Sequence, residues 1–99
     1  MEYIFTEKAL EDLIKHALNY EKMLEGLGYR FMEEVEATAN AISKQPEGYI
    51  SLYKNTRECS TRSFPYKLIY TLEEVIYIHA IYPCKSDPKK KYKNIIKKK

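Results

Sequence analysis

The spacing of apolar residues changes once along the chain, and this change restricts the fold more than any other feature. Between residues 9 and 42, apolar side chains recur every three or four positions, which is the period of an amphipathic helix. From residue 66 onward they alternate with polar side chains or run together, as they do in strands. The sequence therefore predicts an α+β fold, in which a helical part is followed by a sheet.

The helical part is predicted to be an antiparallel hairpin. Residues 2–5 are bulky β-formers that make a short strand, and Thr6 follows them as the cap of a helix over residues 7–24. Two glycines within residues 25–28 end this helix, because glycine tolerates the backbone reversal of a tight turn. The helical spacing resumes over residues 29–44, so the second helix returns alongside the first.

Three strands are predicted in the second half of the chain. Residues 57–63 are polar and strand-like, residues 66–72 alternate, and residues 75–82 are apolar on both faces, as in a central strand. Residues 49–55, which precede them, are predicted to be a loop whose apolar side chains pack back on the domain. The order is strand, helix, helix and three strands, with the hairpin on one face of a small, mostly antiparallel sheet.

Charge is distributed unevenly along the 99 residues. The length fits one domain, which we place at residues 1–88, followed by a basic tail over residues 89–99. Residues 1–48 hold five basic and ten acidic side chains, whereas residues 49–84 are nearly neutral. Residues 85–99 hold eight lysines and one aspartate, so the net charge of +3 conceals a strongly basic end. This end favours an anionic partner.

Several classes of protein are disfavoured by what the sequence lacks. No apolar run reaches the roughly 20 residues that cross a membrane, and the N-terminus lacks the basic and apolar regions of a secretion signal. We therefore expect a cytoplasmic protein with no membrane partner. Cys59 and Cys84 are too far apart for a zinc knuckle or a redox pair, so neither a metal nor a cofactor is expected. His79 lies on the predicted central strand, where a histidine is more often a hydrogen-bonded, half-buried group than a catalyst.

Three short motifs follow one another in the same order as in a known family. Their order and spacing within 99 residues carry more weight than any one of them. They are Phe5-Thr6-Glu7-Lys8-Ala9 at the first strand–helix junction, Gly26-Leu27-Gly28 between the helices, and Arg62-Ser63-Phe64-Pro65-Tyr66-Lys67-Leu68-Ile69-Tyr70 at the alternating strand. On these motifs, residues 3–92 resemble the RelE/ParE superfamily of bacterial toxin–antitoxin toxins.

This resemblance implies one fold with two chemistries. RelE-like members cut messenger RNA in the ribosome, using basic and tyrosine side chains of the last strands on the 2′-hydroxyl and the phosphate. ParE-like members make no such cut and poison DNA gyrase, with the C-terminal part of the chain implicated. Both kinds are silenced by a cognate antitoxin, whose amphipathic segment wraps the hairpin or the sheet and whose acidic residues cover basic ones. A degenerate member would bind the antitoxin and poison nothing.

The end of the last strand favours the ParE-like branch. Many relatives carry a histidine just after this strand, where the chain has Tyr82-Pro83, and an arginine three residues later, where it has Ser86. Proline offers neither a proton acceptor nor a charge for the scissile phosphate. A gyrase inhibitor that is not an enzyme is therefore the favoured interpretation. In the alternative, a ribosome-dependent endoribonuclease, catalysis would fall to Arg62, Lys67, Lys85 and Tyr92.

Basic side chains of the sheet and the tail are the candidates for binding a target or the antitoxin. Arg57 and Arg62 lie five positions apart on one predicted strand, so alternation puts them on opposite faces. A solvated charge at the sheet edge, or a surface pair with Glu58, explains either arginine as well as binding does. Lys67 lies opposite the apolar face of its strand, on the side that the helices are expected to leave open. Lysines of the tail attract phosphates as point charges, which fits DNA, ribosomal RNA or acidic antitoxin residues. The full set is Arg57, Arg62, Lys67, Lys85, Lys89, Lys90, Lys91 and Tyr92.

Overall fold

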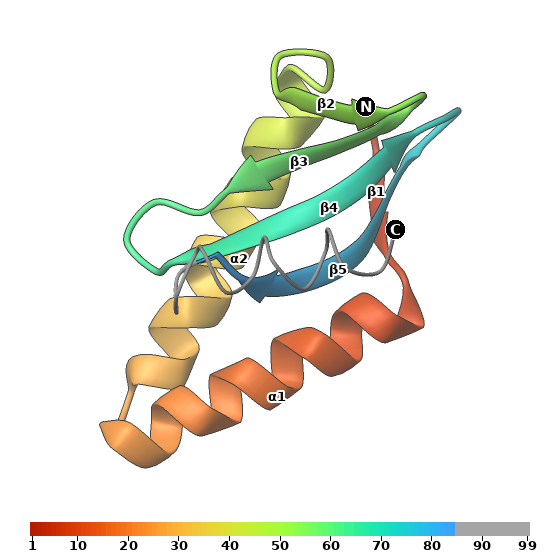
Figure 1. The fold of residues 1–99 in the computed structure, drawn as a ribbon. Helices are drawn as coiled ribbons and strands as arrows, with labels where there is room; N and C mark the ends of the chain where they lie inside the picture. Colours follow the sequence, from red (N-terminus) through yellow and green to blue (C-terminus); the bar gives the residue numbers. More distant parts are fainter. Residues whose placement is uncertain (85–99) are drawn as a thin grey trace, which may run out of the picture.

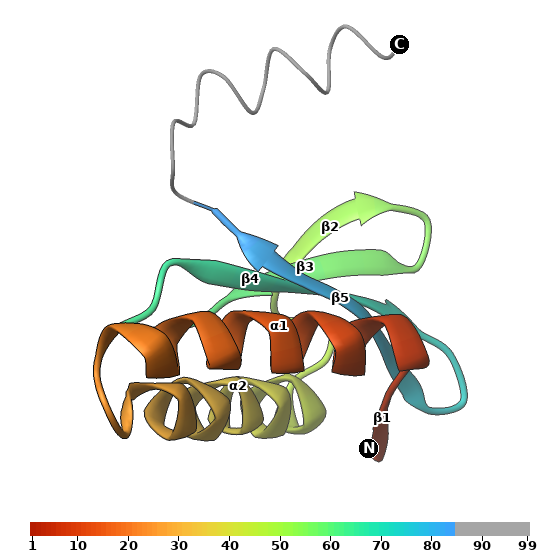
Figure 2. The same ribbon diagram turned by 90° about the horizontal axis from the view of Figure 1, so that it is seen from below.

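The chain forms a helical hairpin that covers one face of a five-stranded sheet. A computed structural model describes residues 1–84, and the predictions made for residues 85–99 lie outside it. The elements are β1 (Tyr3–Phe5), α1 (Glu7–Met23), α2 (Leu27–Lys44), β2 (Ile50–Tyr53), β3 (Thr56–Ser60), β4 (Tyr66–Leu72) and β5 (Ile76–Pro83). The strand order is β1-β5-β4-β3-β2, with β1 parallel to β5 and all other neighbours antiparallel. Both helices lie on the same face (Figures 1 and 2), which confirms the predicted α+β fold.

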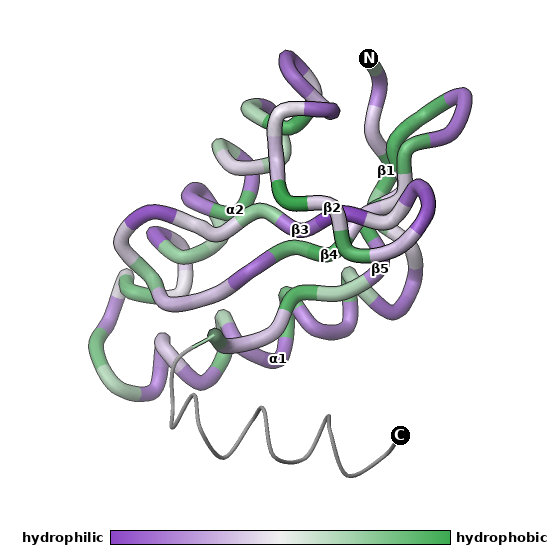
Figure 3. Tube along the Cα trace, turned by 45° about the horizontal axis from the view of Figure 1, so that its top comes forward, coloured by the Kyte–Doolittle hydropathy of each residue, from purple (hydrophilic) through white to green (hydrophobic). Residues whose placement is uncertain are grey.

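The two helices are amphipathic, as their spacing predicted. Hydrophobic and hydrophilic residues alternate along both of them (Figure 3), so one side of each helix can pack on the sheet. Thr6 Oγ1 accepts a hydrogen bond from the N–H of Ala9 at 3.2 Å, which confirms the predicted cap of α1. Neither helix of residues 1–84 combines the length and the apolar character needed to span a bilayer.

The turn between the helices depends on Glu21 and two glycines. Gly26 has a φ of +89°, the left-handed conformation that glycine adopts without strain. The Glu21 carboxylate accepts hydrogen bonds from the N–H of Gly26 at 2.8 Å and of Gly28 at 2.9 Å, which are otherwise unpaired at the start of α2. At Gly28, an added Cβ would lie 2.4 Å from the carbonyl oxygen of Ala17. Only Gly26 therefore reverses the chain, while Gly28 lets the helices touch.

The core lies between the hairpin and the inner face of the sheet. Tyr66, Leu68 and Tyr70 of β4 are buried, as their alternation predicted. Burial raises the pKa of Tyr70 to about 12, so its hydroxyl stays a donor and bonds the carbonyl oxygen of Pro46 at 2.6 Å. The buried apolar residues are Ala9, Ala17, Phe31, Val35, Ala39, Ile42, Cys59, Tyr66, Leu68, Tyr70, Ile76, Ile78 and Ile81.

Aromatic rings join the turn end of the hairpin to the loop before β4. The ring centroid of Phe31 in α2 lies 4.9 Å from that of Tyr66 and 5.3 Å from that of Phe64. The ring centroid of Tyr20 in α1 lies 4.9 Å from that of Phe64, and His16 Nδ1 lies 3.2 Å from the Tyr66 hydroxyl oxygen. Much of the motif that carries the family resemblance therefore has a structural task, since Phe64 and Tyr66 attach the sheet to both helices.

The prediction of a loop over residues 49–55 is wrong, because Ile50–Tyr53 forms the edge strand β2. Only Tyr49 packs against the core as expected, and all four residues of β2 are exposed. A strand with no buried face leaves no alternation in the sequence, so pairing with β3, and not burial, forms it.

The strand β3 is shorter than predicted. It ends at Ser60, so the strand expected over residues 57–63 stops three residues early. The buried hydroxyl of Thr61 donates to a carbonyl oxygen of the loop that follows, which turns the chain away from the strand direction. Arg62 consequently lies in this loop, and the prediction that it shares a strand with Arg57 is wrong.

A β-bulge interrupts β5. Two adjacent residues of β4 lie opposite Ala80 and Ile78, so His79 between them is an extra residue. Ile81 is consequently buried in the core, whereas regular alternation placed it on the same face as His79.

Candidate functional site

The sheet face that the helices leave open carries Lys67, as the alternation of β4 predicted. Lys67 Nζ lies 3.2 Å from Glu58 Oε2 on the neighbouring strand β3, and the two side chains are 21% and 15% exposed. Tyr82 of β5 is paired opposite Lys67 on the other side. We call Glu58, Lys67 and Tyr82 the open-face row. The positive charge of Lys67 is already countered within this row.

Lys67 and Tyr82 of the open-face row both stay protonated near neutral pH, because each has a raised pKa. Burial disfavours the charged form of Lys67, but the hydrogen bond and the negative charge of Glu58 outweigh burial and raise the pKa of Lys67. Burial raises the pKa of the Tyr82 phenol, although the Lys67 ammonium opposes this shift. A general base needs a pKa near the working pH, so neither group is a proton acceptor at neutral pH.

His79 takes part in a separate hydrogen-bonded group on the open face. Its Nε2 lies 2.8 Å from Thr71 Oγ1, and the Thr71 hydroxyl donates to the Glu73 carboxylate at 3.0 Å. Because the Thr71 hydroxyl has one proton, the geometry makes His79 Nε2 the donor to Thr71. His79 is half-buried and hydrogen-bonded, which confirms the prediction made for it.

Arg57 has a structural place at the edge of the sheet. Its Nη1 donates to the carbonyl oxygens of Tyr49 at 2.8 Å and of Glu47 at 3.4 Å, which fixes the segment leading into β2. The predicted surface pair between Arg57 and Glu58 is not formed, because the Glu58 carboxylate binds Lys67 instead. Arg57 therefore has a structural task, which it carries out through one of its guanidinium nitrogens.

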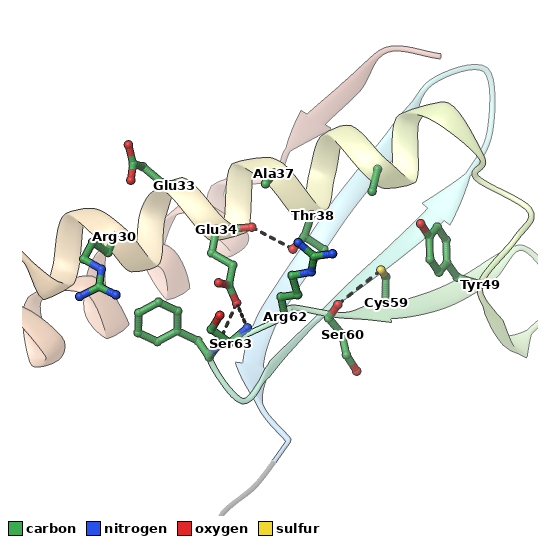
Figure 4. A pocket seen from close by; sticks show the side chains of 12 residues that line it. Arg30, Glu33, Glu34, Ala37, Thr38, Tyr49, Cys59, Ser60, Arg62 and Ser63 are labelled. Atoms are coloured by element: carbon green, nitrogen blue, oxygen red, sulfur yellow. Dashed lines mark hydrogen bonds between the residues drawn. The ribbon is translucent and has the colours of Figure 1, made fainter.

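Arg62 lines a groove between α2 and the chain around the end of β3 (Figure 4), which we call the α2–β3 groove. The groove has a volume of about 650 Å³. Its α2 wall includes Arg30, Ala37 and Ala41, and its opposite wall includes Ser60 and Arg62. The alanines leave the space between the walls open, since their side chains end at Cβ.

One carboxylate sets the width of this groove at its loop end. Glu34 of α2 accepts hydrogen bonds from the N–H of Ser63 at 2.5 Å and of Phe64 at 2.8 Å. The Glu34 carboxylate is thus occupied by these two N–H groups, and it attaches the loop to α2. Glu33 points away from the loop in Figure 4.

Two arginines carry the positive charge of the groove, and the exposed Glu33 also belongs to its lining. The side chains of Arg30 and Arg62 are exposed and form no hydrogen bond or ion pair with the rest of residues 1–84. Arg30 belongs to the family motif that opens the second helix, but no site role was predicted for it from the sequence. The sequence contained one signal for it. Arg30 lies seven positions before Ala37 and eleven before Ala41, so all three residues fall on one side of α2, where two of the side chains are small.

The predicted candidates that fall within residues 1–84 do not come together in one site. Lys67 lies on the open face, Arg62 lies in the α2–β3 groove, and Arg57 lies beside the segment before β2. Outside the described residues lie Lys85, Lys89, Lys90, Lys91 and Tyr92. Among residues 1–84, no three His, Cys, Asp or Glu side chains are grouped so that they could hold a metal ion.

Solved structures of toxins have the same fold. The chain is similar to the chromosomal ParDE toxin–antitoxin system from P. aeruginosa, with a TM-score of 0.74 and 16% identity over 84% of this chain and 95% of that one. It is similar to the isolated E. coli RelE toxin, with a TM-score of 0.63 and 16% identity over 96% and 97% of the two chains. For the intact E. coli RelBE complex the TM-score is 0.62, with 16% identity over 86% and 98%.

Sequence comparison identifies one branch of this fold. No curated protein matches the chain. Residues 3–88, by contrast, match a family described as "ParE toxin of type II toxin-antitoxin system, parDE". This match covers the hairpin, the whole described sheet and the motif around Phe64 and Tyr66. The chain therefore belongs to the ParE toxin family of type II toxin–antitoxin systems.

Proposed function

We propose that this chain is the toxin of a toxin–antitoxin module and that it inhibits DNA gyrase by binding, without cutting RNA. Its place in the ParE toxin family supports this proposal. The observation that carries it is the 3.2 Å ion pair between Lys67 and Glu58, because the pair counters the charge of a lysine that the endoribonuclease alternative needs for the phosphate.

A ribosome-dependent endoribonuclease would need a proton acceptor and free positive charge close together. In the open-face row, burial raises the pKa of Tyr82, so its phenol stays protonated near neutral pH. The carboxylate of the row, Glu58, is engaged by the Lys67 ammonium, which is therefore charged but paired. Arg62, which the endoribonuclease interpretation also requires, lies in the α2–β3 groove. These placements favour a protein that acts by binding.

A cognate antitoxin is proposed to neutralise this toxin in the cytoplasm. The outer side of the hairpin exposes large apolar side chains, which in a free monomer would remain in contact with water. On α1, Leu10, Ile14 and Leu18 are 45%, 55% and 58% exposed and follow one another at intervals of four residues. A stripe with this spacing fits an amphipathic segment of a partner.

Purified protein distinguishes the two chemistries. We expect the wild type to inhibit DNA supercoiling by gyrase and to leave messenger RNA intact on stalled ribosomes. Lys67→Ala should inhibit gyrase as the wild type does, because Glu58 already counters the Lys67 charge. Cutting of messenger RNA that is lost in the Lys67→Ala, Tyr92→Ala double variant, with gyrase unaffected by the wild type, would replace the proposal by the endoribonuclease alternative.

Bacterial growth tests both toxic functions at once. Induction of the chain alone should stop growth, and co-expression of its antitoxin should restore it. The resemblance to the family predicts that this antitoxin is encoded by a short reading frame immediately upstream. Normal growth in cells that contain folded protein would reject both gyrase inhibition and RNA cutting, and would leave a degenerate member that only binds an antitoxin.

A further inference from the structure

We propose that two copies of this chain associate through the outer edge of β2, with their β2 strands antiparallel about a two-fold axis at Ser51. The partner is a second copy of the chain, and the proposal depends neither on the target nor on the antitoxin. Three observations carry it: free backbone groups at Ser51, exposed apolar side chains along β2, and opposite charges on either side of this strand.

The backbone of Ser51 points away from the sheet. The N–H of Thr61 donates to the carbonyl oxygen of Tyr66 at 2.8 Å, so Thr61 directs its backbone groups toward β4. Backbone groups alternate along a strand, so those of Glu58, three positions earlier, are directed toward β2, where Ile50 lies opposite. Ser51 is the next residue of β2, and its N–H and C=O are therefore directed outward. Within residues 1–84 these two groups have no other partner, so an added strand finds a donor and an acceptor there.

The side chains of β2 are apolar and exposed. Ile50, Leu52 and Tyr53 are 64%, 48% and 69% exposed. Strands at the edge of a sheet are commonly protected by charged residues or proline, but residues 49–53 contain neither. The register shift between β2 and β3 begins only after Ser51, so Ile50 and Ser51 form a regular stretch that can accept another strand. Figure 2 shows β2 curving away from both helices, so neither helix covers this edge.

The strand at the other edge of the sheet, β1, offers less surface. It has three residues, of which only Ile4 is exposed, at 47%. Residues at this edge are bound to α2, because the amino group of Met1 donates to the carbonyl oxygen of Ser43 at 3.1 Å. The Tyr3 hydroxyl likewise donates to Asn40 Oδ1 at 3.1 Å. The apolar surface suited to a second copy therefore lies at β2, and Ile4 supplies a matched control position.

Opposite charges flank β2. Glu47 precedes it and Lys54 follows it, both are exposed, and neither forms an ion pair with another of residues 1–84. Two antiparallel copies of this segment bring Glu47 of each copy close to Lys54 of the other, whereas two parallel copies would bring like charges together. A segment with this charge pattern is complementary to its own antiparallel copy, so a second copy fits both of its ends.

Pairing about Ser51 also matches the apolar side chains. Ser51 of each copy exchanges two backbone hydrogen bonds with Ser51 of the other, as the residues of a hydrogen-bonded antiparallel pair do. Ile50 of each copy then lies opposite Leu52 of the other. The two-fold axis through this pair is perpendicular to the sheet, so the two five-stranded sheets become continuous. Both open faces, each with its Lys67, consequently point to the same side.

Sedimentation equilibrium of the purified full chain measures this association. We expect the wild type to form a dimer and Leu52→Lys to weaken the dimer about tenfold or more, because the ammonium would have to leave water at the interface. Ile4→Lys introduces the same charge at an equally exposed position of β1 and should leave the association unchanged. Circular dichroism checks that each variant is folded. A wild type that stays monomeric throughout the micromolar range would overturn the proposal.

A charge exchange tests the antiparallel direction by the same measurement. Glu47→Lys alone should weaken the dimer about threefold, because it replaces an attraction at each end of the interface by a repulsion. Glu47→Lys combined with Lys54→Glu should restore the association, since the exchanged charges again oppose one another. A double variant that associates no better than the single one would reject the antiparallel pairing.

Ser51 itself provides a direct readout. In a hydrogen-bonded antiparallel pair the Cα atoms lie about 5.5 Å apart, a distance that a disulfide spans. Ser51→Cys should therefore give a disulfide-linked dimer in oxidised glutathione, whereas the wild type, with Cys59 and Cys84, should not. Association that persists in Leu52→Lys and is abolished by Leu18→Lys would place the interface on the hairpin and overturn its assignment to β2.

Discussion

The two long sides of α2 use the same hydrogen-bonding device for opposite purposes. Toward α1, the Glu21 carboxylate binds the first N–H groups of α2, and Gly28 allows direct contact with the backbone of Ala17. Toward β3, the Glu34 carboxylate binds two N–H groups of a loop but leaves a groove of about 650 Å³. A carboxylate that holds a loop can therefore close an interface or keep it open. Substitutions that remove either carboxylate contact, or the close approach at Gly28, should therefore lower stability.

Gly28→Ala should have the largest effect on stability. The added Cβ would lie 2.4 Å from the carbonyl oxygen of Ala17, a backbone atom that moves only if α1 moves. We expect the free energy of unfolding to fall by about 3 kcal/mol, measured by urea denaturation. At an open helix position, alanine would instead add up to about 1 kcal/mol. A stabilised Gly28→Ala variant would thus contradict close contact on this side of α2.

Glu34→Ala should have the next largest effect, about 2 kcal/mol, because the N–H groups of Ser63 and Phe64 lose a charged acceptor. Both amides should exchange faster by NMR. Glu34→Gln keeps one accepting oxygen and should lose about half as much, and Glu33→Ala serves as the neighbouring control. Unchanged exchange at both amides in Glu34→Ala would mean that the loop keeps its place without α2.

Glu21→Ala should cost about 1 kcal/mol, since it removes a cap from the start of α2 at an exposed position. In thermal unfolding this corresponds to a decrease in Tm of roughly 4–8 °C for a domain of this size. Glu25→Ala, close by in the same turn, is the matched control. Equal Tm values for the two variants would show that Glu21 does not stabilise the contact between α1 and α2.

Acid should have the smallest effect on stability, and it should act through His16 of α1. Burial lowers the pKa of His16 from 6.5, although the Asp12 charge favours the protonated form. As the pH falls below about 6.5, the unfolded chain therefore binds a proton more readily than the folded one, and stability decreases. Urea midpoints between about pH 7 and pH 5 should fall in the wild type and stay flatter in His16→Gln. Parallel curves would assign the acid sensitivity to another group.

The sequence predicts the elements that bury one face, and it fails where no face is buried. Tyr66, Leu68 and Tyr70 reveal β4 by alternation because every second side chain enters the core. The strand β2 has no buried side chain, so only its backbone pairing distinguishes it from a loop. The sequence does not predict the bulge at His79 either. The strand β5 is apolar on both faces, so one extra residue does not change its pattern.

The candidate site was less predictable than the fold, because its contacts join distant parts of the sequence. The face on which Lys67 lies follows from alternation, but its pairing with Glu58 depends on how β3 and β4 align. Arg30 and Arg62 line one groove, at whose loop end Glu34 accepts the N–H of Ser63. No local spacing encodes that contact.

The bulge at His79 changes how this chain has to be aligned with relatives that share 16% of its residues. Alignments usually place gaps in loops, but here the extra residue lies inside a strand. A gapless alignment with a relative that lacks the bulge would be correct on one side of His79 and one position out of step on the other. Ile81 and Tyr82 would then exchange inward and outward positions, and a role known for one side chain would be transferred to the wrong neighbour.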